Sequence, residues 1–448
     1  MIQQFINRKF ELKVLEERYK SKKPEFLILY GRRRVGKTEL VLNFMKNKPS
    51  IYFLSEEKRD EENREDMQKI MGNFLKDEEF KLIKFENWSD LFKGFLKRIK
   101  RRTIIIIDEF PYLMKENPSI TSEFQKIWDM HVKSNVILIL IGSSISMMEK
   151  LLGVKSPLYG RRTGQIEIKP ISIFEVKKFL PKYTTEDCIN VYGCVDGIPL
   201  YLNQFDGKKT FYDNIRDVFL RRDKMLYSEA EILLKQEFRE PANYFSILKA
   251  ISFGYTRHGE IADYTGIDKT AVTKYIQNLE KVRIVRKEYP VTEKKEKRKS
   301  ARYSFTDNYF KFWFRFIYPN KTSIEMENYR SVLNTIKENY STYMGQPFEK
   351  VCKEFLWRKK PFSFTECGRW WHKDKEIDLV ALGKEKTGFF ECKWKRLSIR
   401  DVKRILKKLE EKSDSFKGNK VFGLIAKNIE DKEKLRNEGY YAFDLRDF

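Results

Sequence analysis

The chain has 448 residues, and its 90 lysines and arginines exceed its 65 aspartates and glutamates, which gives a formal net charge of +25. This length predicts about three domains, if each domain takes ~150 residues. The five cysteines form no C-x-x-C pair, the three histidines argue against a His-rich metal site, and no apolar run approaches the ~18 residues of a membrane span. We therefore expect a soluble cytoplasmic protein in a reduced compartment, with no secretion signal at its N-terminus and no membrane partner.

The excess positive charge predicts a polyanionic partner, with nucleic acid (DNA) ahead of an anionic membrane. The alternative is a Lys/Glu-rich surface of the kind found in heat-adapted proteins, which needs no such partner. Charge alone leaves a homo-oligomer or a protein partner open.

The most specific motif joins an apolar strand at residues 26–30 to a helix at residues 39–45. It reads Gly31-Arg32-Arg33-Arg34-Val35-Gly36-Lys37-Thr38 and matches G-x-x-x-x-G-K-[ST], the phosphate-binding P-loop. The glycines let backbone N–H groups face an anion, Lys37 would reach the β- and γ-phosphates, and the Thr38 hydroxyl would bind Mg²⁺. We therefore expect residues 31–38 to bind a nucleoside triphosphate. The roles of Arg32, Arg33 and Arg34 stay open between nucleotide, lid and DNA contacts.

Two further apolar runs, at residues 103–107 and 136–141, predict strands buried on both faces of a parallel sheet. The first run ends in Asp108 and Glu109, at the sheet edge that faces the phosphates in P-loop enzymes. Asp108 would hold Mg²⁺ through its water shell, and Glu109 would activate the attacking water as a general base. The alternative is a pair of solvated loop acids.

Two polar positions beyond these strands are further candidates for the nucleotide site. Ser143 follows the second run and would orient the water or sense the γ-phosphate, unless it only forms a turn. Arg161 follows Gly160 and would stabilise transition-state charge, unless it is a surface residue.

These segments together resemble archaeal P-loop ATPases of the AAA-related STAND class. The segments that carry the resemblance are Phe5-Ile6-Asn7-Arg8, Gly31 to Thr38, Ile107-Asp108-Glu109-Phe110-Pro111-Tyr112, Gly142-Ser143-Ser144 and Pro157-Leu158-Tyr159-Gly160-Arg161. The resemblance implies that the nucleotide is ATP. It also implies an ATPase core over residues 1–170 and a helical lid over residues 171–240.

Residues 241–308 have a different pattern, which predicts a winged helix-turn-helix. Helical stretches near residues 247–251 and 260–265 precede a third over 269–281 that Asp268 can cap, and strands at 284–289 and 302–305 follow. The basic run from Lys294 to Lys299 joins the two strands as a wing, whose lysines would contact DNA phosphates. The alternative is a winged helix that serves as a lid or a protein-docking module.

The rest of the chain predicts an aromatic and helical linker over residues 309–340 and an α/β domain over residues 341–448. Glu391 and Lys393 point to the same side of one predicted strand, and Asp378 lies on the strand before it. The carboxylates would bind Mg²⁺ or Mn²⁺, and Lys393 would assist the attacking water or stabilise phosphate charge. Glu349, on a helix, would add a ligand.

This set resembles the core of PD-(D/E)xK nucleases, which have a restriction-endonuclease-like α/β fold, as found in the DUF234 domain often fused to these archaeal ATPases. No proline precedes Asp378, but that proline is not a ligand. The sequence thus predicts an α/β protein in which an ATPase core, a helical lid, a winged helix and a nuclease-like domain act on DNA with ATP and Mg²⁺. The alternatives are a non-nucleolytic ATP-dependent switch that regulates transcription or protein assembly, and a protein-docking ATPase without DNA affinity.

Overall fold

The computed structural model describes residues 6–132, 135–293 and 301–448. The basic run from Lys294 to Lys299, which the sequence predicts to form the wing, lies outside these described residues. The chain forms two compact units, Met1–Pro170 and Ile171–Phe448.

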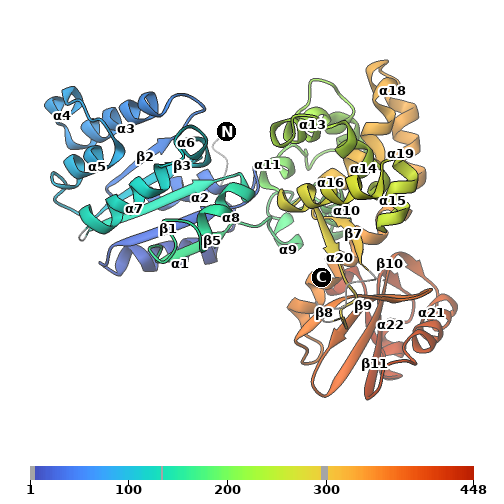
Figure 1. The fold of residues 1–448 in the computed structure, drawn as a ribbon. Helices are drawn as coiled ribbons and strands as arrows, with labels where there is room; N and C mark the ends of the chain where they lie inside the picture. The colour runs from blue at the N-terminus through green and yellow to red at the C-terminus, as the bar shows by residue number, and fades with distance from the viewer. Residues whose placement is uncertain (1–5, 133–134, 294–300) are drawn as a thin grey trace. The chain divides into compact units, whose positions relative to one another are not determined.

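A five-stranded parallel sheet forms the centre of the first unit, with the spatial strand order β2-β3-β4-β1-β5 (Figure 1). The strands are β1 Glu25–Tyr30, β2 Ser50–Leu54, β3 Thr103–Asp108, β4 Val136–Gly142 and β5 Gly164–Glu167. The residues of β1, β3 and β4 are buried along their whole length, because helices cover both faces of the sheet. The predicted α/β class and its parallel-sheet core are confirmed.

Alternate strand residues of the first unit pack against different helices. Leu27 and Leu29 share one apolar cluster with α1 and α2, whereas Phe26 and Ile28 share another with α3, α5 and α7. The helices are α1 Lys9–Lys20, α2 Lys37–Met45, α3 Asp60–Leu75, α4 Glu78–Leu82, α5 Trp88–Leu96, α6 Pro111–Glu116, α7 Ile120–His131 and α8 Ile145–Leu152.

The second unit begins with helices and continues into three more helices followed by an antiparallel strand pair. The first group is α9 Ile173–Val176, α10 Thr185–Val195, α11 Pro199–Leu202, α12 Phe211–Phe219 and α13 Met225–Glu237. The second group is α14 Ala242–Ser252, α15 His258–Thr265, α16 Lys269–Lys281, β6 Val285–Glu288 and β7 Arg302–Phe305. Asp268 caps α16 by accepting hydrogen bonds from the backbone N–H groups of Thr270 and Ala271, which is the cap that the sequence predicts. This is the element order that the winged-helix prediction requires.

The aromatic segment after β7 is buried in the core of the second unit. The side chains of Phe312, Trp313 and Phe314 are fully buried, and the Trp313 indole N–H donates to the Tyr227 carbonyl oxygen at 2.7 Å. The segment therefore packs the unit together rather than presenting rings to a nucleic acid. Its helices are α17 Asn308–Phe312, the π-helical turn η1 Trp313–Ile317, the 3₁₀ turn η2 Tyr318–Asn320, α18 Lys321–Glu325, α19 Tyr329–Tyr343 and α20 Gly345–Lys359.

A mixed five-stranded sheet ends the second unit, in the order β12-β11-β10-β9-β8 (Figure 1). Strands β8, β9 and β10 are antiparallel neighbours, and β10, β11 and β12 run parallel. Phe390 and Cys392 pack in the same cluster as α20, while Phe389 on the other face packs with α21. The elements are β8 Glu366–His372, β9 Lys375–Leu382, β10 Lys386–Leu397, α21 Ile399–Lys412, β11 Asn419–Ile429, α22 Lys432–Asn437, β12 Tyr441–Phe443 and the 3₁₀ turn η3 Leu445–Asp447.

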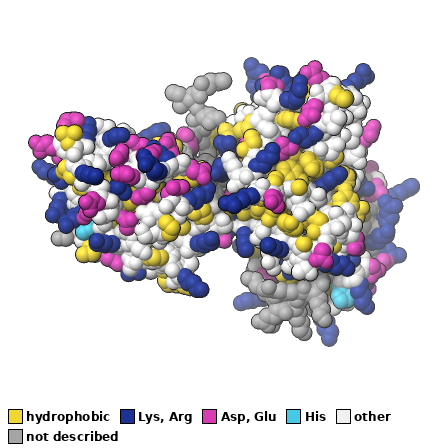
Figure 2. All heavy atoms as spheres, turned by 45° about the horizontal axis from the view of Figure 1, so that its top comes forward, with side chains coloured by type: hydrophobic (Ala, Val, Ile, Leu, Met, Phe, Trp, Pro, Cys, Tyr) yellow, Lys and Arg dark blue, Asp and Glu magenta, His cyan; other side chains and the backbone are white. Residues whose placement is uncertain are grey.

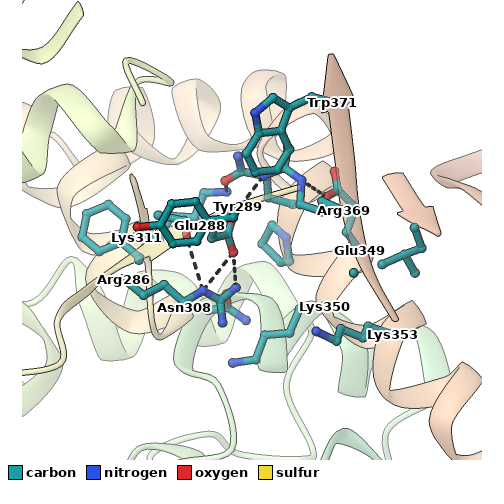
Figure 3. A pocket seen from close by; sticks show the side chains of 16 residues that line it. Arg286, Glu288, Tyr289, Asn308, Lys311, Glu349, Lys350, Lys353, Arg369 and Trp371 are labelled. Carbon is teal, nitrogen blue, oxygen red and sulfur yellow. Dashed lines mark hydrogen bonds and ion pairs between the residues drawn. The ribbon is translucent and has the colours of Figure 1, made fainter. Parts of the chain in front are cut away.

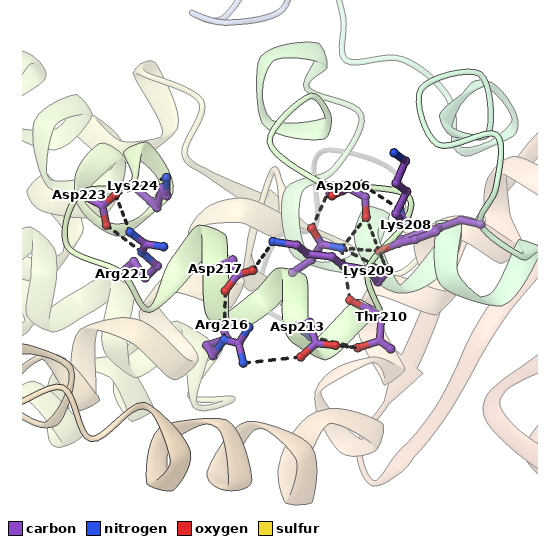
Figure 4. A network of polar contacts seen from close by, with 12 residues as sticks. Asp206, Lys208, Lys209, Thr210, Asp213, Arg216, Asp217, Arg221, Asp223 and Lys224 are labelled. Atoms are coloured by element: carbon purple, nitrogen blue, oxygen red, sulfur yellow. Dashed lines mark hydrogen bonds and ion pairs between the residues drawn. The ribbon is translucent and has the colours of Figure 1, made fainter.

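Charged side chains of both signs are interspersed on the surface that Figure 2 displays. Near α12, Asp217 pairs with Lys209 at 2.7 Å and with Arg216 at 3.0 Å (Figure 4). Exposed pairs of this kind contribute only ~0–1 kcal/mol each. Part of the positive charge is thus locally balanced, so the net charge by itself does not locate a binding surface. None of the helices in the described residues has the length and apolar character that crossing a membrane requires.

Candidate functional site

The carboxyl ends of β1, β3 and β4 meet at one edge of the parallel sheet of the first unit. Strand β4 lies between β3 and β1, so the loops that follow these three strands begin side by side. The P-loop, residues 31–38, follows β1, Asp108 ends β3 with Glu109 next to it, and Ser143 follows β4. The fold thus brings the P-loop, the two acids and the serine to one place.

The two glycines of the P-loop adopt backbone positions that a side chain would not tolerate. Gly36 precedes α2 with φ of +89°, in the left-handed region that favours glycine. A Cβ on Gly31 would collide with the Ile168 carbonyl oxygen, because the loop passes close to that segment. The backbone N–H groups at the start of α2 are the donors that an anion meets at a helix N-terminus.

Lys37 is held inside the loop. Its Nζ donates to the carbonyl oxygens of Gly31 at 2.9 Å and Arg32 at 3.1 Å. Burial lowers the pKa of Lys37 to about 8, although the nearby carboxylates of Glu109 and Asp108 oppose that shift. A cation is therefore present where the motif predicts phosphate contact, and its charge is lost as the pH rises through about 8.

Neutral hydroxyl groups hold the Asp108 carboxylate. Its Oδ2 accepts from the Thr38 hydroxyl at 2.7 Å and from the Tyr52 hydroxyl at 2.8 Å, and its Oδ1 accepts from the backbone N–H of Glu109 at 2.8 Å. Burial and the Asp108 charge raise the pKa of Tyr52, so the phenol keeps its proton. The sequence did not point to Tyr52 as a site residue. The only signal is its hydroxyl group in a strand of mostly apolar residues.

Glu109 adopts a strained backbone and has a fixed side chain. Its φ is +52°, which is uncommon for a residue other than glycine. The Ser143 hydroxyl lies 2.6 and 2.7 Å from the two carboxylate oxygens, and the Ser143 backbone N–H donates to Oε2 at 3.3 Å. Strain of this kind clusters at functional sites, and here it accompanies the acid that the sequence predicts as the general base.

Arg8, which the sequence did not predict as a site residue, and the predicted Arg161 have different surroundings. Arg8, buried and with φ of +73°, donates to the Val35 carbonyl oxygen at 2.7 Å and so supports the P-loop from the segment before α1. Arg161 instead pairs with Asp129 of α7 at 3.1 Å and donates to the Pro157 carbonyl oxygen. Within the described part of the chain, Arg161 thus forms an ion pair with α7 and no hydrogen bond to the P-loop. Arg33 reaches the Tyr112 hydroxyl at 3.4 Å.

The residues around the P-loop fit a nucleotide with Mg²⁺. Mg²⁺ is bound in such sites by one or two protein oxygens together with substrate phosphates and waters. The Thr38 hydroxyl and the Asp108 carboxylate are adjacent oxygen groups of this kind. No group of three or more His, Cys, Asp or Glu residues, within the part of the chain that the structure describes, could hold a metal ion by itself. The predicted metal role of Thr38 and Asp108 therefore depends on the substrate as a co-ligand.

Asp378, Glu391 and Lys393 lie together on β9 and β10 of the second unit. Lys393 Nζ contacts Asp378 Oδ2 at 2.8 Å and Glu391 Oε2 at 2.5 Å. Glu391 Oε1 also accepts from Lys412 of α21 at 2.7 Å, a residue that sequence reasoning missed. Burial raises the pKa of Asp378, but the Lys393 ammonium outweighs burial and lowers it overall. Burial and the Asp378 charge instead raise the pKa of Glu391. Each carboxylate thus already contacts a lysine ammonium group.

Glu349 differs from its predicted role as a third metal ligand of this set. Its Oε2 pairs with Arg369 Nε at 3.0 Å. Burial, together with the charge of Asp378, raises the pKa of Glu349 to about 8 despite Arg369. An acid that is largely protonated at neutral pH and paired with an arginine is a poor metal ligand. Arg369 directly precedes Trp370 and Trp371 in β8. It is the residue of the sequence that could have indicated an arginine partner for Glu349.

One side of α16 is polar and exposed. Lys269, Thr270, Thr273, Lys274 and Gln277 line a shallow surface depression together with His258, and the buried residues Val272, Ile276 and Leu279 take the opposite side. His258 Nε2 lies 2.9 Å from the Thr273 hydroxyl. The face combines two lysines, which form no ion pair with the residues that the structure describes, with the hydrogen-bonding side chains of Thr270, Thr273 and Gln277.

Comparison with known proteins assigns families to both ends of the chain. A family described as an ATPase domain predominantly from Archaea matches residues 5–205. A second, DUF234, described as archaeal and bacterial proteins of unknown function, matches residues 313–405. The uncharacterized protein MJECL04 of Methanocaldococcus jannaschii is 42% identical over 458 residues, covering 99% of this chain and 100% of the relative. An uncharacterized ATP-binding protein of that organism is 54% identical over 44 residues, 10% of this chain and 75% of the relative.

A solved structure is similar over most of the chain. The Walker-type ATPase PABY2304 of Pyrococcus abyssi has a TM-score of 0.53 and 20% sequence identity, with 70% of this chain and 97% of that chain covered. At this identity the likeness establishes a common fold.

Proposed function

We propose that this chain, which belongs to the archaeal family that joins an ATPase domain to a C-terminal DUF234 domain, uses ATP to control how its second unit engages DNA. Membership of the family makes the chain an ATP-hydrolysing enzyme. The DNA step and the residue roles below are the proposal.

In the ATPase site, we assign each side chain the role that its surroundings support. Lys37 and the backbone N–H groups of residues 31–38 bind the substrate phosphates, because the loop leads into the N-terminus of α2, where Lys37 is the first residue. Glu109 accepts the proton of the attacking water, and Ser143 orients that carboxylate. Thr38 and Asp108 would hold Mg²⁺, which would neutralise charge on the substrate phosphates.

The exposed face of α16 is the observation that carries the DNA part of the proposal. In a winged helix-turn-helix the third helix enters the major groove. Lys269 and Lys274 supply positive charge for phosphates, and Thr273 and Gln277 supply donors and acceptors for base edges. The wing predicted from Lys294 to Lys299 would add contacts to the backbone.

A DNA titration at two salt concentrations tests this part. We expect affinity for a duplex to fall about tenfold or more between 50 and 200 mM salt, because each phosphate contact releases counterions. Lys274→Ala should weaken binding and reduce the salt slope by about one contact. The matched control is Lys403→Ala, an exposed lysine on α21, which should leave binding unchanged. Affinity that does not respond to salt, or equal binding by both variants, would reject α16 as the contact.

The C-terminal set supports a metal-dependent step on DNA as the finer part of the proposal. Two buried carboxylates with a lysine between them are the groups that phosphodiester hydrolysis needs, since they bind a cation and stabilise negative charge on the phosphate. Mg²⁺ or Mn²⁺ would have to displace Lys393 and Lys412 from the oxygens that they now contact.

A second candidate function follows, because a metal ion would have to displace these lysines. Because the lysines already balance both carboxylates, the chain also fits a non-nucleolytic switch that binds ATP and DNA without cutting. Assays of ATP hydrolysis and DNA nicking on wild type, Lys37→Ala and Asp378→Ala separate the two. Nicking that Asp378→Ala abolishes while ATP hydrolysis persists supports the nuclease. Unaltered DNA at every Mg²⁺ and Mn²⁺ concentration, with DNA binding still dependent on ATP, supports the switch.

A further inference from the structure

A partly open pocket lies in the second unit, lined by residues of the β6–β7 strand pair and of the C-terminal sheet. It has a cavity volume of about 320 Å³, which falls within the ~300–1,000 Å³ range of small-ligand sites. Figure 3 shows its side chains coming from β6, α17, α20 and β8. These elements are far apart in the sequence, so the fold alone creates the cavity.

The pocket lining is predominantly cationic. Five cations, Arg286, Lys311, Lys350, Lys353 and Arg369, face two carboxylates, Glu288 and Glu349. The arginines are paired, since Arg286 contacts Glu288 at 2.6 Å and Arg369 contacts Glu349 at 3.0 Å. Lys350 is also paired, with Asp196 at 2.5 Å. Among the described residues, the surplus positive charge therefore lies on Lys311 and Lys353.

Lys311 lines the pocket and is partly buried there, without a carboxylate partner among the described residues. Its ammonium has three N–H donors, and one of them bonds the Gln346 side-chain oxygen at 2.5 Å. In the described residues no carboxylate lies within ion-pair distance of Lys311, and its ammonium stands 5.3 Å from the Tyr343 ring centroid. An ammonium group enclosed by protein is costly unless it is paired, so a bound anion would stabilise the charged form of Lys311.

An open groove beside the pocket shares three of its cations. Arg286, Lys350 and Lys353 line both, and the groove lining also includes Arg358 together with the carboxylates Glu175 and Glu354. Lys353 is exposed and no carboxylate of the described residues pairs with it. Cations that continue from the surface into a cavity raise the local concentration of anions.

We propose that this pocket binds a small phosphate-bearing molecule, with Lys311 as its buried contact and Lys353 at its mouth. A doubly charged phosphate group matches these two lysines better than a single carboxylate does. The aromatic rings of Tyr289 and Trp371 in the wall leave an apolar surface for the organic part of the ligand. Such a ligand would contact β6, α20 and β8 together, and it would therefore link the winged-helix segment to the C-terminal sheet.

The charge of the pocket depends on pH, which gives the proposal a second readout. Burial lowers the pKa of Lys311 to about 7 and raises the pKa of Glu349 to about 8. Raising the pH therefore removes the Lys311 charge and adds the Glu349 charge, and both changes weaken anion binding. The charged or titratable groups that face Lys311 are Glu349, Arg369, Glu288, Arg315 and Tyr343.

The test is calorimetric titration of full-length Lys37→Ala protein, in which the P-loop is impaired, with inorganic phosphate, AMP and succinate as probes. We expect AMP to bind more tightly than phosphate, and phosphate more tightly than succinate. Lys311→Met should weaken AMP binding about tenfold, because a buried charge-assisted contact is lost. Lys353→Met should have a smaller effect, and the exposed control Lys407→Met should have none.

Two results would overturn the proposal. One is AMP or phosphate binding that disappears in Lys37→Ala while wild type binds, since the anion then occupies the P-loop. The other is succinate binding as tightly as phosphate, or AMP affinity that Lys311→Met leaves unchanged.

A loss of binding in Lys311→Met could also come from misfolding. Glu349→Gln excludes that explanation, because this variant should strengthen anion binding. With sulfate as a probe of constant charge, affinity should fall between pH 6.5 and 8.5, and Glu349→Gln should reduce that fall. If sulfate affinity does not change with pH, or if Glu349→Gln weakens binding at pH 8.5, the pocket is not the anion site.

Discussion

The two carboxylate sites of this protein differ in what holds the acids. Around the P-loop, hydroxyl groups of Thr38, Tyr52 and Ser143 hold Asp108 and Glu109. In the C-terminal sheet, the ammonium groups of Lys393 and Lys412 hold the acids. Hydroxyl groups fix a carboxylate without cancelling its charge, whereas an ammonium group balances it. The first site is therefore ready for a cation or a proton, and the second must first give up a lysine contact.

The first way to test this comparison is to remove the charge of Glu109. Glu109→Gln should lower kcat for ATP hydrolysis about 10²–10⁴-fold, because the amide does not accept a proton from water. ATP binding should persist, since the phosphates are held by other groups. Turnover and equilibrium binding of ATP should be measured together, with the exposed Glu116→Gln as control. A variant that hydrolyses ATP at the wild-type rate would exclude Glu109 as the base.

The second test removes the buried cation of the P-loop. Lys37→Met should reduce kcat/KM for ATP about 100-fold or more, because a charged contact to the phosphates is lost in a site shielded from water. Steady-state kinetics should be compared with Lys46→Met, an exposed lysine next to the end of α2. A similar loss in both variants would indicate general destabilisation, which a thermal unfolding curve would reveal.

The third test concerns the hydroxyl that holds Glu109. Ser143→Ala should lower kcat about tenfold with little change in KM, because the carboxylate loses a hydrogen-bond partner that orients it. Ser143→Thr should recover part of the rate, since it retains the hydroxyl. If KM rises instead while kcat stays constant, Ser143 serves substrate binding and the positioning role is wrong.

The fourth test uses the pKa of Lys37, which burial lowers to about 8. The ammonium is charged below this value and neutral above it, so affinity for Mg·ATP should fall several-fold between pH 7 and pH 9. Binding measured by equilibrium dialysis should show this slope in wild type and lose it in Lys37→Met. A slope that survives in the variant would come from another group.

The smallest expected effect is in the C-terminal site. Lys412→Met should raise Mn²⁺ affinity about threefold, because Glu391 loses an ammonium that competes with the metal. Electron paramagnetic resonance of bound Mn²⁺ would measure it, with Lys408→Met on the same helix as control. Weaker Mn²⁺ binding in Lys412→Met would mean that the lysine supports the site rather than blocking it.

Local sequence determined much of the fold. The P-loop and the apolar runs at residues 103–107 and 136–141 predicted the parallel sheet, because strands buried on both faces need continuous apolar residues. The Asp268 cap and the spacing of the apolar residues predicted α16 with the bounds that the structure has.

Tertiary structure alone decided which charges meet. Tyr52 hydrogen-bonds to Asp108, Arg369 pairs with Glu349 and Lys412 pairs with Glu391. Strand pairing and helix packing bring these residues together. Their neighbours in the sequence do not indicate the contacts. The same reason explains the cationic pocket, whose Lys311 and Lys353 come from separate helices. The spacing of apolar residues can be read from the sequence. An ion pair instead depends on distances of a few ångströms between segments that only the folded chain brings close.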